Sequence, residues 1–120
     1  MESKKMNTLA IGTNGERMAE KFLINKGYKL LRRNYRYKRA EIDLIMQTED
    51  VITFIEVKTR KNKAFGNPEE FVTEMQAERI MDAAENYLAE NKLDIPFRFD
   101  IVAITMNPVM EILHLEDAIA

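Results

Sequence analysis

The sequence predicts a single α/β domain over residues 1–120, with its elements in the order α-β-β-β-α-β-β. Apolar residues recur at helical spacing in two stretches, whereas five shorter stretches are rich in β-branched and aromatic residues. The chain has 120 residues, which is enough for one hydrophobic core, and it contains no internal repeat or flexible linker. The segments are therefore expected to pack as one unit.

The first expected helix covers residues 14–27 and ends at Gly27. Its apolar stripe consists of Met18, Ala19, Phe22 and Leu23. A strand over residues 28–35 is expected to follow, and residues 40–60 read as a hairpin of two alternating strands with a four-residue turn over 47–50.

A loop marked by Gly66 and Pro68 precedes the second expected helix. Thr73 and Gln76 have the spacing of a capping box, and the helix is expected to run to about Asn91. The last two expected strands cover residues 97–105 and 109–116.

Composition excludes several kinds of chemistry. The chain has no cysteine, so it has no disulfide, no thiolate zinc site and no thiol nucleophile. His114 is the only histidine and Ser3 the only serine, which makes a Ser-His-Asp triad improbable; we expect His114 to be a packed surface residue and not a ligand. The chain has no apolar run long enough to span a membrane and no export signal, so we expect a cytoplasmic protein without a membrane partner.

Charge is divided unevenly along the chain although the net charge is only −2. Residues 21–63 carry twelve Lys and Arg against five Asp and Glu, whereas residues 64–120 carry three against twelve. An asymmetry of this kind indicates a surface that binds a polyanion.

The expected hairpin carries charged residues inside two apolar strands. Its turn places Glu41 opposite Glu56 and Asp43 opposite Phe54, and this register puts Glu41, Asp43, Glu56 and Lys58 on one face. Two carboxylates from adjacent strands suit a hard divalent cation, and the Lys58 ammonium would orient water or offset charge on a phosphate. The pattern indicates phosphodiester hydrolysis. The alternative is a set of ordinary surface ion pairs, each contributing about 0–1 kcal/mol.

At these residues the sequence resembles the PD-(D/E)xK nuclease superfamily, and more closely the YraN-like family, uncharacterised protein family 0102. The matching pieces are Gly12, Gly15-Glu16 and Ala19, then "GY", "RRNYR", "EIDLI", "FIEVKTR", "G-N-P", "VT", Arg79-Ile80, "YL" and "RFDIV". Their order and spacing over about a hundred residues carry the resemblance.

The resemblance implies a restriction-endonuclease-like fold with a central mixed β-sheet flanked by helices. It also implies that Asp43 and Glu56 bind Mg²⁺ or Mn²⁺ together with the Val57 carbonyl, and that Lys58 is the catalytic lysine. Glu16 resembles an extra acid of archaeal Holliday-junction resolvases, although a glutamate near a helix N-terminus is also favoured by the helix dipole.

The sequence departs from the family at two positions. Ala40 replaces a usual glycine, and Gln76 stands where lysine is common, which removes a charge that would touch phosphate. We expect Gln76 and Asp100 to support the site indirectly, and Arg98 to pair with Asp100 on one strand face.

Basic residues interleaved with Tyr35 and Tyr37 precede the hairpin, and more follow Lys58. The residues expected to bind nucleic acid are Arg32, Arg33, Arg36, Lys38, Arg39, Arg60 and Lys61. The alternative is that they keep an edge strand soluble.

The sequence thus favours a metal-dependent nuclease acting on DNA, either branched or single-stranded. The alternatives are a nucleic-acid-binding or assembly module that retains the fold without catalysis, and a structural protein-interaction domain. Nucleases of the superfamily often dimerise to cut two strands, so a homodimer is compatible with the resemblance, although the chain has no clear dimer signature.

Overall fold

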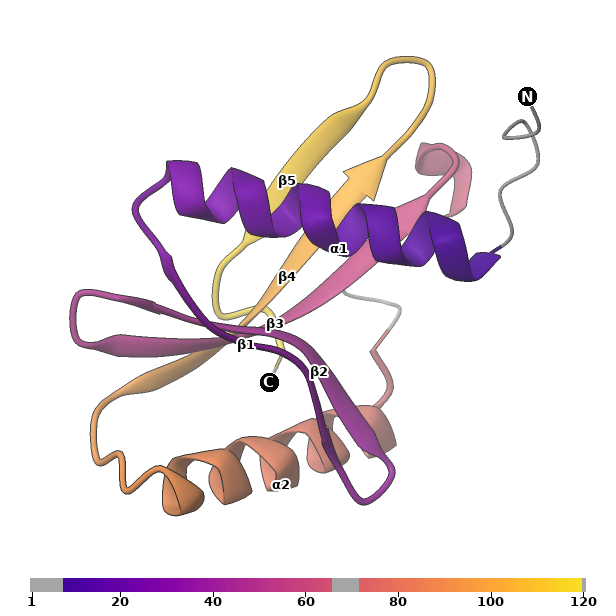
Figure 1. Ribbon diagram of the computed structural model, residues 1–120. Helices are drawn as coiled ribbons and strands as arrows, with labels where there is room; N and C mark the ends of the chain where they lie inside the picture. Colours follow the sequence, from indigo (N-terminus) through magenta and orange to yellow (C-terminus); the bar gives the residue numbers. More distant parts are fainter. Residues whose placement is uncertain (1–7, 66–71, 120) are drawn as a thin grey trace.

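The computed structural model describes residues 8–65 and 72–119. A five-stranded sheet carries one long helix on each face (Figure 1). The elements are α1 (Thr8–Asn25), β1 (Lys29–Tyr37), β2 (Ala40–Thr48), β3 (Val51–Arg60), η2 (Lys63–Phe65), α2 (Glu74–Glu90), β4 (Phe97–Thr105) and β5 (Glu111–Leu115). This order of long helices and strands confirms the expected α-β-β-β-α-β-β fold.

The sheet is mixed, and its strands lie in the order β1-β2-β3-β4-β5. β3 and β4 are parallel, while the other neighbours are antiparallel. Parallel neighbours need a crossover connection, which α2 provides between β3 and β4. β3 therefore occupies the centre of the sheet, as its apolar sequence indicated.

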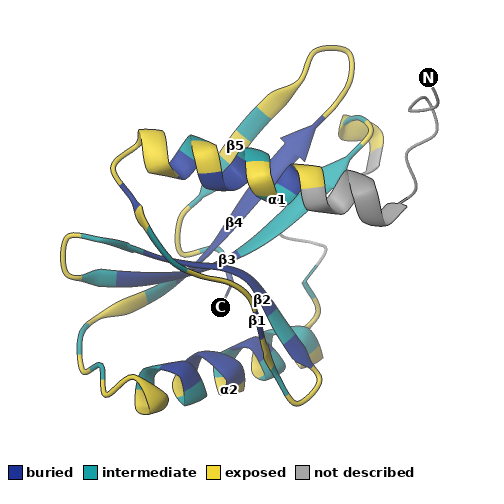
Figure 2. Ribbon diagram, viewed as in Figure 1, coloured by how far each residue is buried: buried dark blue, intermediate teal, exposed yellow. Residues whose placement is uncertain are grey.

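Each face of the sheet packs against one helix. On one face, Ala19 and Leu23 of α1 pack with residues such as Leu44 of β2. On the other, Ile80 and Ala84 of α2 pack with a second cluster of strand residues. Figure 2 shows the buried sides of both helices turned toward the sheet.

α2 begins at the predicted capping box. The Thr73 hydroxyl accepts a hydrogen bond from the Gln76 backbone N–H at 3.1 Å, and the Gln76 side chain accepts one from the Thr73 N–H at 3.3 Å. The expected loop residues Gly66 and Pro68 lie outside the described residues. Within the described part of the chain, no helix combines the length and the apolarity that crossing a membrane requires.

Close contact between α1 and the sheet requires a glycine. Gly15 faces Thr59 of β3, and a Cβ atom at residue 15 would collide with the Thr59 hydroxyl and touch Ile104. The next residue, Glu16, accepts a hydrogen bond from Asn34 of β1, so the close approach of α1 also brings an acidic side chain to the sheet.

We expect Gly15→Val to destabilise the protein by about 1–3 kcal/mol, because the larger side chain would push α1 away from Thr59. Chemical denaturation measures this loss. Lys21→Val is the matched control, since it places valine at an exposed position of the same helix. Helix propensity alone would make Gly15→Val slightly favourable and Lys21→Val slightly unfavourable. A loss at Gly15→Val no larger than the loss at Lys21→Val would therefore contradict the close contact with Thr59.

Candidate metal and phosphate site

Asp43 and Glu56 lie where β2 and β3 separate. The last paired residues of the two strands are Leu44 and Ile55. Beyond them, the Val57 backbone N–H donates a hydrogen bond to Asp43 Oδ2 at 2.8 Å. The Asp43 carboxylate thus takes the place of a backbone acceptor on β2, and it ends the ladder between the two strands.

The predicted hairpin turn was wrong by two residues in register. Thr48 pairs with Val51, so the turn consists of Glu49 and Asp50, with Glu49 at φ 52°. Positive φ is typical of two-residue hairpin turns, whose twist matches that of the strands. The β-branched Thr48 extends the strand into what the sequence suggested was turn.

A shift of two residues changes the partners of the acidic residues. Extending the observed register by one pair brings Asp43 opposite Glu56, whereas the sequence analysis had placed it opposite Phe54. The expected pairing of Glu41 with Glu56 is also wrong, because the ladder ends before Glu41 is reached. The shift preserves side-chain alternation, so the two predicted metal ligands become direct neighbours.

The expectation that Glu41, Asp43, Glu56 and Lys58 lie on one regular face of the sheet needs a correction. Ile42 packs in the cluster on the α2 side of the sheet, whereas Leu44 packs on the α1 side, so regular alternation breaks at Asp43. Asn34 lies across from Asp43 on β1 and has φ 49°. The strands are kinked here, and this kink turns Asp43 into the gap beside β3.

Glu56 and Lys58 point to the α2 side of β3. Glu56 stands between Ile55 and Val57, which both pack on the α1 side. Lys58 Nζ lies 3.3 Å from Glu56 Oε2. The acids therefore meet at the gap between the strands rather than on a plain sheet surface.

Asp43 is buried and Glu56 is half-buried, and the charge of Glu56 opposes ionisation of Asp43. Asp43 is 8% exposed. Burial, together with the charge of Glu56, raises the pKa of Asp43 to about 8 although the Val57 N–H lowers it. Burial also raises the pKa of Glu56, against the opposing effect of Lys58. Lys58 thus offsets the charge of Glu56, whereas Asp43 is bound by the Val57 N–H.

This donor set fits a divalent cation that retains water. Among the described residues, no three Asp, Glu or His side chains form a ready metal cage. Mg²⁺, however, is commonly held by one or two carboxylates, with water and substrate oxygens completing its shell. Asp43 and Glu56 would supply the carboxylates. The Val57 carbonyl faces the same gap, because the N–H and C=O of a strand residue point the same way.

Glu16 and Glu41 lie around the pair in different ways. Glu16 reaches the gap from α1, where it accepts a hydrogen bond from Asn34 Nδ2 at 3.0 Å, and its charge raises the pKa of Asp43. Glu41 pairs with Arg36 at 3.8 Å. Asn34 had not been predicted, and positive φ at an asparagine is the signal that identifies it in the structure.

Several of the basic residues expected to bind nucleic acid have partners within the protein. Arg33 forms a bidentate contact with Glu20, with hydrogen bonds of 2.8 and 2.9 Å. Arg36 pairs with Glu41. Arg32 lies over the ring of Tyr35, 5.1 Å from its centroid. These side chains stabilise the strand.

The remaining predicted cations lie closer to the ends of the strands. Lys38 lies over the Tyr37 ring, and Arg60 Nε donates to the Thr105 hydroxyl at 2.9 Å. Arg39 and Lys61 are exposed.

Asp100 belongs to a separate buried network. It accepts two hydrogen bonds from Arg98, at 2.9 and 3.0 Å, as expected for that pair, and one from the Asp117 N–H. His114 Nε2 lies 2.7 Å from it. Burial alone would raise the pKa of Asp100, but bonds to His114 and Arg98 together hold it below its ordinary value.

The separate network changes two expectations. Asp100 contacts neither Asp43 nor Glu56 through any hydrogen bond or ion pair of the described residues. Its partner Arg98 also bonds Tyr28, which packs on the α1 side of the sheet. His114, expected to be a packed surface residue, is instead a buried member of this network. Gln76 does approach the site, because it lines a cavity together with Glu56.

The protein has an α/β domain of restriction-endonuclease-like fold. A mixed sheet carries one helix on each face, and the acids and the lysine lie where β2 and β3 separate. The profile of the Uncharacterised protein family UPF0102 matches residues 15–104. The chain belongs to this family, which is the YraN-like group named by the resemblance.

Relatives of similar length support the assignment. The chain is 40% identical over 109 residues to a UPF0102 protein of Christiangramia forsetii, covering 90% of this chain and 92% of the relative. It is 41% identical over 124 residues to a UPF0102 protein of Chloroherpeton thalassium, covering 94% and 96%. It is 42% identical over 100 residues to one of Clostridioides difficile, covering 82% and 88%.

We expect Asp43→Asn to stabilise the metal-free protein by about 1–3 kcal/mol at pH 8, equivalent to one or two pKa units. The folded protein keeps the Asp43 proton up to a pKa of about 8, whereas the ordinary pKa is 3.8. The wild type therefore loses stability as pH rises between these values, and asparagine removes that loss while keeping an acceptor for Val57.

Urea denaturation of both proteins at pH 5 and pH 8, with chelator present, measures the effect. Asp50→Asn, in the exposed hairpin turn, is the matched control. An Asp43→Asn effect that does not grow with pH would contradict the assignment of a buried, proton-binding Asp43.

Proposed function

We propose that this protein is a metal-dependent nuclease that hydrolyses phosphodiester bonds in nucleic acid, with DNA as the expected substrate. The observation that carries the proposal is the pair of carboxylates in the gap between β2 and β3, the buried Asp43 and the half-buried Glu56. Lys58 stands 3.3 Å from Glu56. Membership of an uncharacterised family is compatible with this activity and does not assign it.

The acids are suited to hold a cation rather than to act as acid and base by themselves. Burial raises the pKa of both acids, and the charge of Glu56 raises the pKa of Asp43 further; a cation between them would offset both effects. A bound Mg²⁺ or Mn²⁺ would polarise the scissile phosphate and activate water for attack. Asp43, Glu56 and the Val57 carbonyl are the groups we assign to holding it.

Lys58 is suited to assist the reaction at the substrate. Its ammonium lies beside Glu56 and is partly exposed, so it can reach a phosphate oxygen or a water while staying oriented by the carboxylate. A positive charge at this place stabilises the negative charge that develops on the phosphate during attack. Hydrolysis would leave a phosphate on one side of the cut and a hydroxyl on the other.

Divalent cations should stabilise the wild type, and they should do so more strongly at pH 8.5 than at pH 6. Binding requires both acids to lose their protons, and the raised pKa of Asp43 makes that loss incomplete at the lower pH. Thermal unfolding with Mn²⁺ or Mg²⁺ measures the shift, and Asp43→Asn should abolish most of it. An equal shift in the variant would place the metal elsewhere.

Purified protein should cut DNA in the presence of Mg²⁺ or Mn²⁺, and Asp43→Asn and Lys58→Gln should each lower the rate at least about 100-fold. A panel of duplex, single-stranded, flap and four-way junction DNA identifies the substrate. Asp50→Asn and Lys63→Gln are matched controls, because both positions are exposed and have no place in the site.

Cleavage that persists unchanged in both site variants would mean contamination or another active site. DNA binding without cleavage under any metal condition would reject hydrolysis and favour the alternative of a binding module.

A further inference from the structure

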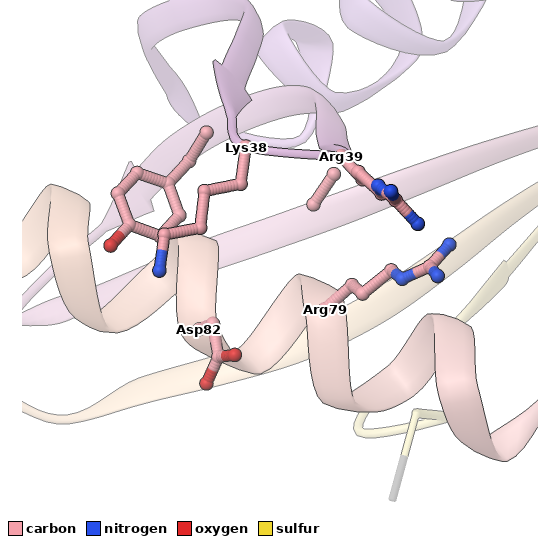
Figure 3. Close-up of a pocket in the computed structure, with 6 residues that line it drawn as sticks. Lys38, Arg39, Arg79 and Asp82 are labelled. Atoms are coloured by element: carbon pink, nitrogen blue, oxygen red, sulfur yellow. The ribbon is translucent and has the colours of Figure 1, made fainter.

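Two cavities open between the β1–β2 turn and α2, beside the acid pair. The larger has a volume of about 210 Å³ and is shown in Figure 3. The smaller, of about 140 Å³, reaches Glu56. Both are lined by Arg39, Ala40 and Arg79. The two arginines therefore stand where the path from the acid pair enters the larger cavity.

Arg39 and Arg79 come from different elements and face a common space. Arg39 lies in the turn after β1, and Arg79 lies in the first half of α2. Figure 3 shows both guanidinium groups at the same end of the cavity, with Asp82 at the other end. Neither guanidinium forms an ion pair with a carboxylate of the described residues.

The nearest acids of the smaller cavity already have cationic partners. Glu41 pairs with Arg36, and Glu56 pairs with Lys58. Acidic side chains line both cavities, but none of the described ones pairs with Arg39 or Arg79. The two guanidinium groups therefore repel each other, and an anion bound between them reduces that repulsion. Arginine presents a planar fork of N–H donors that matches the oxygens of a phosphate.

We propose that Arg39 and Arg79 jointly bind one phosphodiester of a nucleic-acid strand, next to the phosphate held at Asp43 and Glu56. This inference rests on the proposed nuclease function. It directs the strand from the acid pair across the α2 side, toward the β1–β2 turn. The strand does not follow β1, where Arg33 is held by Glu20.

Binding of a short fluorescent single-stranded DNA, about 10–15 nucleotides long, tests the subsite in EDTA, where metal-dependent cleavage cannot occur. Arg39→Gln and Arg79→Gln should each weaken binding about 5–20-fold, and each should reduce the salt slope by about 0.7. Arg79→Lys should recover only part of the affinity, since lysine keeps the charge without the fork.

Lys92→Gln is the matched control. It removes the same charge from an exposed position beyond the far end of α2, about 20 Å along the helix axis from Arg79. It should leave binding within about twofold of the wild type, because a single distant charge is largely screened. Thermal unfolding of every variant verifies that the fold is retained.

Two comparisons separate a shared phosphate from general attraction. The double variant Arg39→Gln/Arg79→Gln should lose less affinity than the product of the two single losses, because both side chains bind the same phosphate. Replacing phosphates one at a time by neutral methylphosphonates should reveal one position that weakens the wild type and leaves the double variant unaffected. Free inorganic phosphate should compete with the DNA for the wild type and much less for the double variant. Equal competition in both proteins would mean general attraction of anions, and would contradict the proposal.

Three results would each reject the subsite. They are losses of affinity that multiply in the double variant, a Lys92→Gln effect as large as the arginine effects, and absence of DNA binding by the wild type. The outcome is independent of hydrolysis. If the subsite is confirmed but no metal-dependent cleavage occurs, only the nuclease function is rejected. If the protein cleaves DNA but both arginine variants bind it as the wild type does, only the subsite is rejected.

Discussion

The hydrogen bond from the Val57 N–H to the Asp43 carboxylate is the interaction on which the site depends. An antiparallel ladder normally pairs each such N–H with a backbone carbonyl of the next strand. Here a side chain takes that place, so the two central strands can separate without leaving a buried donor unpaired. The gap that results contains two acids and a lysine. Burial in this gap, together with the charge of Glu56, raises the pKa of Asp43 to about 8.

The surrounding elements supply different parts of this arrangement. Gly15 lets α1 approach β3, which brings Glu16 near the acids from one side. β1 and β2 both depart from regular strand geometry here, at Asn34 and Asp43, and Asp43 bonds the Val57 N–H of β3. On the other side of the sheet, α2 contributes Gln76 and Arg79 to a cavity that contains Glu56. The buried network around Asp100 stabilises the sheet but lies apart from these groups. An acidic interior and an arginine-lined entrance thus coexist within one small domain.

The sequence predicted the elements well because their signals are local. Helical spacing, strand alternation and the Thr73–Gln76 capping box depend on neighbouring residues, and the structure retains them. The hairpin turn was misplaced because a four-residue turn and a two-residue turn give the same alternation of side chains between the two sheet faces. Only the observed pairing of Thr48 with Val51 distinguishes the two turns. Lys58 lies beside Glu56, as their shared strand face indicated, whereas the choice of Asp43, Glu56 and Lys58 as a catalytic set stays a prediction. Other features depend on contacts between distant elements, which one sequence does not encode in a local pattern. These features are the partners of Arg33 and Arg36, the burial of the His114 side chain and the position of Arg79. Arg79 is nevertheless the sole basic residue within Glu74–Glu90, a signal that could have identified it.

The most direct test of the central idea is to follow the side-chain carboxyl carbons of Asp43 and Glu56 by NMR across a pH titration, with and without Mg²⁺. Without metal, Asp43 should keep its proton to a pKa of about 8, and removing Glu56 by substitution with glutamine should lower that pKa. With Mg²⁺, both carboxyl signals should shift together and Asp43 should ionise at a lower pH. Ordinary titration of Asp43 that neither Glu56→Gln nor Mg²⁺ changes would contradict a shared, cation-binding acid pair.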